Sequence, residues 1–84
     1  MELKETCEMM VSDDYKERFR AEYYQAKIRQ KKLRNLLDLW NNGELTFTPS
    51  CPKDLLEEQE LRMDQYILIL EKRAKIEGVN LCLS

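Results

Sequence analysis

The 84-residue sequence has no histidine, two glycines, two prolines and three widely spaced cysteines. Without histidine, the chain lacks the usual general base of nucleophilic catalysis and the commonest side-chain ligand of transition metals. Cys7, Cys51 and Cys82 are odd in number and form no Cys-x-x-Cys pair, so neither a disulfide framework nor a zinc site is expected. We therefore expect a protein that is not an enzyme and that carries no metal and no cofactor.

Glycine-rich loops and long apolar segments are also missing. Gly43 and Gly78 stand alone, so no glycine-rich loop is available to hold a phosphate. No apolar run approaches the ~20 residues that a membrane-spanning helix requires. The first ten residues, MELKETCEMM, are acidic where a secretory signal peptide would be basic. With free thiols, such a chain is expected to be a soluble intracellular protein with no membrane partner.

The net charge of −2 conceals an uneven distribution of charged residues. Residues 1–14 carry one basic and five acidic side chains, whereas residues 15–42 carry eight basic and three acidic ones. Residues 52–77 carry five basic and seven acidic side chains. The acidic overall balance argues against a nucleic-acid polymer as partner, and the basic segment is where a smaller anion would bind.

Residues 13–42 are predicted to form the first long helix, about 45 Å long at ~1.5 Å per residue. Ser12 is the expected N-cap residue, and Gly43 follows the expected C-terminus. Tyr24 and Ile28 lie on the side opposite a regular apolar seam, so two faces of this helix are apolar. The seam repeats at alternating intervals of four and three, with one polar member, and consists of Phe19, Tyr23, Ala26, Gln30, Leu33, Leu37 and Trp40.

Residues 52–77 are predicted to form the second long helix, which ends at Gly78. Its apolar sector spans roughly 160° on a helical wheel, too wide for one partner helix to cover. Leu61 and Leu68 lie outside that sector. The sector contains Leu55, Leu56, Gln59, Met63, Tyr66, Ile67, Ile69, Leu70, Arg73 and Ala74.

Two long helices joined by a short connection predict an all-α fold, an antiparallel helical hairpin with a short N-terminal helix or arm. Leu3, Cys7 and Met10 are the expected apolar side of that arm. One hairpin cannot cover both faces of either helix, so we expect a homo-oligomer. The expected organisation is a single domain over 1–84, with an arm at 1–11, helices at 13–42 and 52–77, a loop at 43–51 and a tail at 78–84.

A stripe of basic residues runs along the first predicted helix, bordered by Tyr23 and Tyr24. Cations edged by aromatic rings are suited to holding phosphates by charge and bases by stacking. Alternatively, the stripe pairs with an acidic stripe on the second helix, and the sequence leaves both interpretations open. The basic stripe is Lys16, Arg20, Lys27, Lys31 and Arg34, and the acidic stripe is Glu57, Glu60, Asp64 and Glu71.

Arg62, Tyr66 and Arg73 lie on the other flank of the second helix. No acidic partner for this flank is evident within the chain, so an anion or another subunit is the expected partner. Gln59 and Arg73 either mark the edges of the apolar sector or line a cavity between subunits. Both interpretations remain open for Arg73, and the edge is the favoured one for Gln59.

Residues 12–78 resemble a family of very small phage-encoded helical-hairpin proteins. This family is similar to the hairpin domain of phage anti-CBASS and anti-Thoeris sponge proteins. The resemblance is carried by Asp14-Tyr15-Lys16-Glu17-Arg18, by Glu22-Tyr23 with Lys27, by Leu45-Thr46-Phe47-Thr48-Pro49, and by Leu55-Leu56, Gln59, Met63, Tyr66, Leu70 and Arg73. Where better-known members favour Met-Trp, this chain has Asp64-Gln65-Tyr66.

The resemblance implies a homo-oligomer, typically a hexamer, in the cytoplasm of an infected bacterial host. It would sequester cyclic dinucleotides or cyclic trinucleotides between subunits, without cleaving them. Members with a cyclic ADP-ribose site carry a further β-rich segment, which is absent here, so that ligand is not expected. By position, Tyr15 resembles the base-stacking aromatic, Lys27 or Lys31 the phosphate contact, and Arg73 a further cation. The full predicted ligand-binding set is Tyr15, Arg20, Tyr24, Lys27, Lys31, Tyr66 and Arg73.

Two other functions fit the sequence less closely. A helical protein-interaction module that inhibits a host protein by direct docking would expose apolar residues such as Tyr24, Ile28, Leu61 and Leu68. A small DNA-binding regulator conflicts with the acidic isoelectric point and with the lack of a short turn before a recognition helix.

Overall fold

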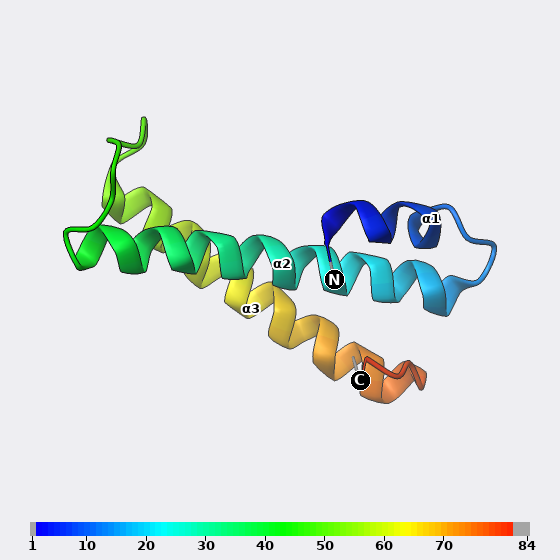
Figure 1. Ribbon diagram of the computed structural model, residues 1–84. Helices are drawn as coiled ribbons and strands as arrows, with labels where there is room; N and C mark the ends of the chain where they lie inside the picture. Colours follow the sequence, from blue (N-terminus) through cyan, green and yellow to red (C-terminus); the bar gives the residue numbers. More distant parts are fainter. Residues whose placement is uncertain (1, 82–84) are drawn as a thin grey trace.

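The computed structural model describes residues 2–81 as an all-helical hairpin with a short N-terminal segment (Figure 1). Two long helices, α2 (Tyr15–Asn41) and α3 (Lys53–Glu77), run antiparallel and cross at an angle. The 3₁₀ helix η1 (Leu3–Thr6) and the single turn α1 (Cys7–Met10) lie along the first half of α2, on the side away from α3. Residues 2–81 contain no strand, and none of their helices is long and apolar enough to cross a membrane.

The first long helix begins at Tyr15, with Asp14 as its N-cap residue. The Asp14 carboxylate accepts a hydrogen bond from the Lys16 backbone nitrogen at 3.0 Å. The prediction that Ser12 caps this helix was wrong. Instead, the Ser12 hydroxyl accepts from the Asp14 nitrogen at 3.1 Å and donates to Glu17 at 3.0 Å, so it orders the segment that precedes the cap.

Asp14→Ala is expected to lower the free energy of unfolding by about 1 kcal/mol, because one of the unpaired N–H groups at the start of α2 loses its acceptor. Urea titration followed by circular dichroism measures the change. Asp13→Ala is the matched control, since exposed Asp13 makes no hydrogen bond within residues 2–81 and its loss should cost less than about 0.5 kcal/mol. Equal losses for both variants would contradict the capping assignment.

Both glycines end helices, as the sequence predicts. Gly43 (φ 72°) follows α2 and Gly78 (φ 71°) caps α3, each in the left-handed region that glycine adopts without strain. After Gly78, the Val79 nitrogen donates to the Ala74 carbonyl at 2.9 Å, and the Val79 side chain is buried. Leu81 packs against the same core, whereas Cys82 and the rest of the predicted tail lie outside the described residues.

The core lies between the two long helices. The predicted seam of α2 faces α3, and Gln30 at its centre is buried with its amide 3.4 Å from both the Glu60 and the Asp64 carboxylates. These hydrogen bonds therefore compensate for the burial of the Gln30 amide. The buried apolar residues of this interface are Phe19, Tyr23, Ala26, Leu37, Ile67, Leu70 and Ala74.

The second apolar face of α2 is covered from within the chain. Tyr24 is only 5% exposed, and Met9 packs against the cluster that contains it. Thr6 is fully buried, and its hydroxyl accepts a hydrogen bond from the Gln25 amide at 2.9 Å. The N-terminal segment therefore covers the first half of this face, which corrects the expectation that the chain leaves it open.

The arm packs through different residues from those that the sequence indicated. Cys7 and Met10, expected on its apolar side, are exposed, whereas Thr6 and Met9 face the helix. The reason is the 3₁₀ turn at Leu3–Thr6, which has about three residues per turn and shifts the register of the α1 turn that follows.

The wide apolar sector of α3 is only partly covered. Ile67, Leu70 and Ala74 face α2 and are buried, whereas Leu55 is 53% and Ile69 55% exposed. These two lie on the flank of α3 that α2 does not reach. The chain by itself therefore leaves an apolar flank of α3 open to solvent.

Candidate anion-binding groove

The structure places the predicted site residues in separate parts of the hairpin. Lys27 and Lys31 line a groove on one side of α2, while Tyr15 and Arg73 meet at the open end of the hairpin. The Tyr66 hydroxyl donates a hydrogen bond to Glu22, and Tyr24 is buried beneath the N-terminal segment. The seven residues therefore do not form one site within a single chain.

The cationic groove lies on α2 and has a volume of about 440 Å³. Lys27 and Lys31 are one helical turn apart, and both side chains are exposed. Neither lysine forms an ion pair with any of residues 2–81. The groove is lined by Lys27, Ile28, Gln30, Lys31, Arg34 and Asn35.

The acidic stripe of α3 neutralises one cation of this groove. Arg34 binds the Glu60 carboxylate through both Nε and Nη2, each at 2.9 Å. Because the Arg34 side chain is 55% exposed, the pair is worth at most about 1 kcal/mol. The interpretation that the two stripes pair is thus confirmed for Arg34. Lys27 and Lys31 keep their charge available for an external anion.

The terminal cluster joins Tyr15, Phe19, Arg73 and Glu77 at the other end of the hairpin. Arg73 donates from Nε to Glu77 at 2.9 Å and from Nη2 to the Tyr15 hydroxyl at 2.9 Å, and Tyr15 in turn donates to Glu77. The guanidinium carbon lies 4.9 Å from the centroid of the Phe19 ring, a cation–π distance. The prediction that the arginine flank lacks partners within the chain was therefore wrong.

The other members of that flank also have partners. The Tyr66 hydroxyl donates to the Glu22 carboxylate, and Arg62 lies 3.8 Å from Glu58. Glu22 was not recognised as a partner, because a helical wheel of α3 carries no information about which residues of α2 stand opposite.

The chain was compared with known protein families, with curated proteins and with solved structures. The family model described as Sequestin matches residues 13–76. The chain belongs to the Sequestin family. No curated protein and no solved structure matches.

The Sequestin match confirms the family resemblance that the sequence indicated. It includes every residue of the cationic groove, together with Tyr15 and Arg73. The N-terminal segment, whose residues 2–11 cover the second face of α2, precedes the matched region. The groove and the hairpin therefore belong to the part of the chain that the Sequestin model describes.

Four residues of the groove were absent from the predicted set, three of them polar and the fourth Ile28. Gln30, Arg34 and Asn35 contribute an amide, a guanidinium and a second amide to its lining. Arg34 was recognisable as the next member of the basic stripe, since it lies one turn beyond Lys31. Gln30 was recognised only as a polar member of the seam, and nothing in the sequence distinguishes Asn35 from any other exposed amide.

Arg20 and Tyr24 have structural contacts in the chain. The Arg20 Nε donates to the Asn80 carbonyl at 2.8 Å, so this cation secures the segment after α3. Tyr24 stacks edge-on against Tyr23, with ring centroids 5.9 Å apart. Binding of a ligand to the Tyr24 ring would require the N-terminal segment to move.

The terminal cluster makes stability dependent on pH. The hydrogen bond from Arg73, and then that from Tyr15, lowers the pKa of Glu77 from its ordinary value of 4.5. The bond to Glu77 also raises the pKa of Tyr15 and of Arg73. A lowered carboxyl pKa stabilises the fold at neutral pH, and this contribution disappears as the pH falls through the folded-state pKa.

Glu77→Gln is therefore expected to unfold at a lower urea concentration than the natural protein at pH 7. The difference should shrink as the pH falls below about 4.5, where the natural carboxylate becomes protonated. Urea midpoints at several pH values measure this. The control is Glu57→Gln, because the exposed side chain of Glu57 has no hydrogen bond or ion pair within residues 2–81. A difference that is constant with pH would contradict the assignment.

Proposed function

We propose that this Sequestin protein is a phage anti-defence protein that sequesters cyclic oligonucleotide immune signals in the host cytoplasm without cleaving them. The observation that carries the proposal is that Lys27 and Lys31, in the cationic groove, have no ion-pair partner among residues 2–81. The family name, which denotes sequestration, supports a binding role for the groove.

The chemistry of the groove suits a compact ligand with more than one phosphate. Lys27 and Lys31 are separated by about 6 Å along the helix axis, at ~1.5 Å per residue. Their ammonium groups offer two cations side by side, and Arg34 offers a third when Glu60 gives way. Exposed Asn35 provides an amide group for the edge of a base, and Ile28 provides apolar surface.

Binding without cleavage is supported by the side chains that line the groove in one chain. Lysine, arginine, amide and isoleucine side chains bind phosphates and bases, and none of the six lining side chains is a carboxylate, imidazole or thiol that could serve as a general base at neutral pH. A protein of this kind lowers the free concentration of a signal in proportion to its own abundance. Tight binding alone is enough for that effect.

Self-association into a homo-oligomer, a hexamer in the form we propose, would complete the groove. All six lining residues come from α2, so one chain supplies only one wall. The uncovered flank of α3, with Leu55, Tyr66 and Ile69 at roughly half exposure, offers apolar surface for a second copy. A neighbouring chain would then contribute aromatic and cationic groups such as Tyr15 and Arg73.

A thermal-shift panel of cyclic dinucleotides and cyclic trinucleotides tests the proposal, with linear dinucleotides as controls. A ligand at a hundredfold excess over its Kd stabilises the folded state by about 2.7 kcal/mol. We expect a marked rise in the melting temperature with at least one cyclic compound. No shift with any of them far above micromolar concentration would refute the proposal.

Direct docking on a host protein is the second candidate function, favoured by Leu61 and Leu68, each 51% exposed on α3. It predicts a monomer or dimer that shows no thermal response to nucleotides. Light scattering on the same sample distinguishes the two, because sequestration between subunits requires the larger assembly.

A further inference from the structure

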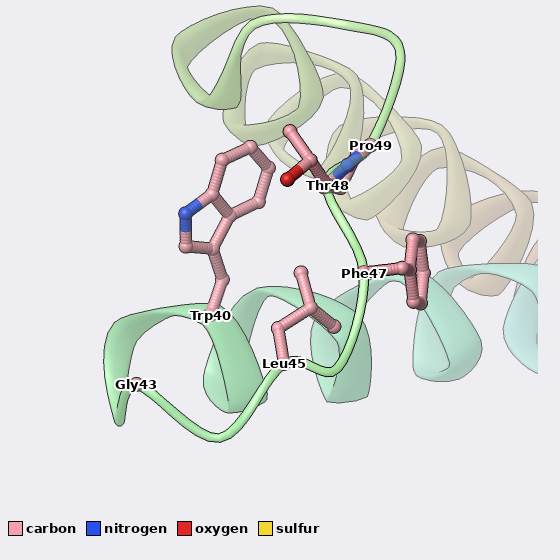
Figure 2. Close-up of a pocket in the computed structure, with 6 residues that line it drawn as sticks. All are labelled: Trp40, Gly43, Leu45, Phe47, Thr48 and Pro49. Atoms are coloured by element: carbon pink, nitrogen blue, oxygen red, sulfur yellow. The ribbon is translucent and has the colours of Figure 1, made fainter.

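Arg34 is shared by two hollows of opposite charge. It lines the cationic groove together with Lys31, and it also lines an acidic hollow of about 320 Å³ together with Asp38, Glu57 and Glu60. By contrast, none of the six residues that line the hollow beside the loop after α2 is charged, so that hollow has no cationic side chain for a phosphate (Figure 2). Arg34 therefore stands at the boundary between a surface that attracts anions and one that repels them.

The ion pair with Glu60 holds Arg34 on the acidic side of this boundary. Arg34 donates from Nε to Glu60 Oε1 at 2.9 Å, and its Nη2 lies 2.9 Å from the same oxygen. The Gln30 amide lies 3.4 Å from that oxygen, so Glu60 has a further contact that does not depend on Arg34. The Glu60 side chain is 22% exposed and the Arg34 side chain 55% exposed. Arg34 is therefore the member of the pair that can leave, because it is the more exposed and the less constrained.

Lys27, Lys31 and Arg34 form a row of three cations along α2. Their intervals of four and three residues keep them on one face of the helix, over a length of about 10 Å at ~1.5 Å per residue. Lys27 and Lys31 have no ion-pair partner among residues 2–81, so two phosphates can reach them without breaking an ion pair. A third phosphate in this row requires Arg34, and it reaches Arg34 only by replacing Glu60.

Taking the proposed function as given, we propose that Arg34 is the specificity-determining residue of the groove and exchanges Glu60 for the third phosphate of a cyclic trinucleotide. A guanidinium binds a phosphate through two parallel, charge-assisted hydrogen bonds. An exposed ion pair, by comparison, changes an equilibrium constant by at most about fivefold. The exchange is therefore favourable. A cyclic dinucleotide, whose two phosphates are held by the two lysines, gains nothing from it, so the groove selects the trinucleotide.

The ratio of the Kd values of cyclic di-adenylate and cyclic tri-adenylate tests the proposal, because the two compounds share a base and differ in the number of phosphates. We expect the natural protein to bind the trinucleotide more tightly. Glu60→Gln keeps the length of the side chain but frees Arg34, so this preference should rise about three- to fivefold. Arg34→Gln should lower it about tenfold, because the third phosphate loses its contact. Isothermal titration calorimetry at fixed ionic strength measures both constants.

Glu57→Gln is the matched control. Glu57 lies one turn before Glu60 on α3 and lines the same acidic hollow, but its exposed side chain has no ion pair within residues 2–81. The substitution changes the net charge as Glu60→Gln does, so it affects both compounds alike and should leave the ratio within about twofold of the natural value. Circular dichroism establishes that the three variants are folded.

A ratio that stays unchanged in folded Glu60→Gln and Arg34→Gln, while the natural protein binds both compounds, would refute the role of Arg34 and leave the proposed function standing. A ratio that changes equally in Glu57→Gln would also refute it, since the effect would then be one of overall charge. A natural protein that prefers the dinucleotide contradicts the proposal as well. If the natural protein binds neither compound far above micromolar concentration, the proposed function fails together with this inference.

Discussion

Leu70→Asp is expected to abolish cooperative unfolding and most of the helical circular dichroism signal. Leu70 is 1% exposed, at the centre of the contact between α3 and α2. Truncating a buried leucine costs about 2–5 kcal/mol, and burying a carboxylate without a partner adds several more. A domain of this size has a total stability of only about 5 kcal/mol, so the substitution exceeds what the fold can lose.

Leu68→Asp is the matched control, two residues earlier on the same helix. Leu68 is 51% exposed, so its replacement removes little buried surface and leaves the carboxylate in water. This variant should retain its helical signal and a cooperative transition in urea. If Leu70→Asp were as stable as Leu68→Asp, the packing described between the two helices would be wrong.

The double variant Lys27→Glu, Lys31→Glu is expected to weaken binding of a cyclic oligonucleotide by at least a hundredfold. A hydrogen bond to a charged group contributes about 1.5–3 kcal/mol, so losing two costs at least about 3 kcal/mol before any repulsion is counted. Both residues are exposed, so the fold and the assembly should be unaffected. Isothermal titration calorimetry at fixed ionic strength measures the change.

A charge-matched control separates the groove from the overall charge of the protein. Arg29→Glu, Lys32→Glu changes the net charge of the same helix by the same amount, at exposed residues outside the groove. Long-range effects of charge are screened beyond about 8–10 Å at physiological salt, so this control should lose less than tenfold in affinity. Similar losses for both double variants would mean that binding does not occur in the groove.

The contact between the long helices was predictable from the sequence, because residues spaced at alternating intervals of four and three all lie on one face of a helix. Phe19, Tyr23, Ala26 and Leu37 follow that spacing, and all four are buried against α3. Likewise, Gly43 and Gly78 were identifiable as helix ends because glycine adopts the left-handed conformation without strain.

The contacts between elements distant in sequence were less predictable. Helical wheels describe each helix alone, so they did not indicate that Tyr66 stands opposite Glu22 or that Arg73 reaches Tyr15. Nor did they indicate that the N-terminal segment buries Tyr24. The pattern suggested that this segment makes apolar contacts with α2, whereas the Thr6 hydroxyl makes a hydrogen bond to that helix. These features depend on register between elements, which a single sequence does not specify.

For the groove, the sequence identified the cations and the acidic stripe opposite them, but not which of the cations the acids neutralise. Lys27, Lys31 and Arg34 were visible as one stripe, yet only Arg34 meets a carboxylate of the opposing stripe. Which lysines stay unpaired is decided by the crossing of two helices, and that crossing is a property of the packed core. The availability of Lys27 and Lys31 is therefore a structural result.

The central claim is that the protein captures a cyclic oligonucleotide and returns it unchanged. The most direct measurement incubates the ligand with excess protein, determines the free ligand after filtration, then denatures the protein and analyses the released ligand by mass spectrometry. We predict that the free ligand falls nearly to zero and that denaturation restores the full amount of intact molecule. A free concentration that stays at its starting value, or the recovery of a cleaved product, would contradict the account.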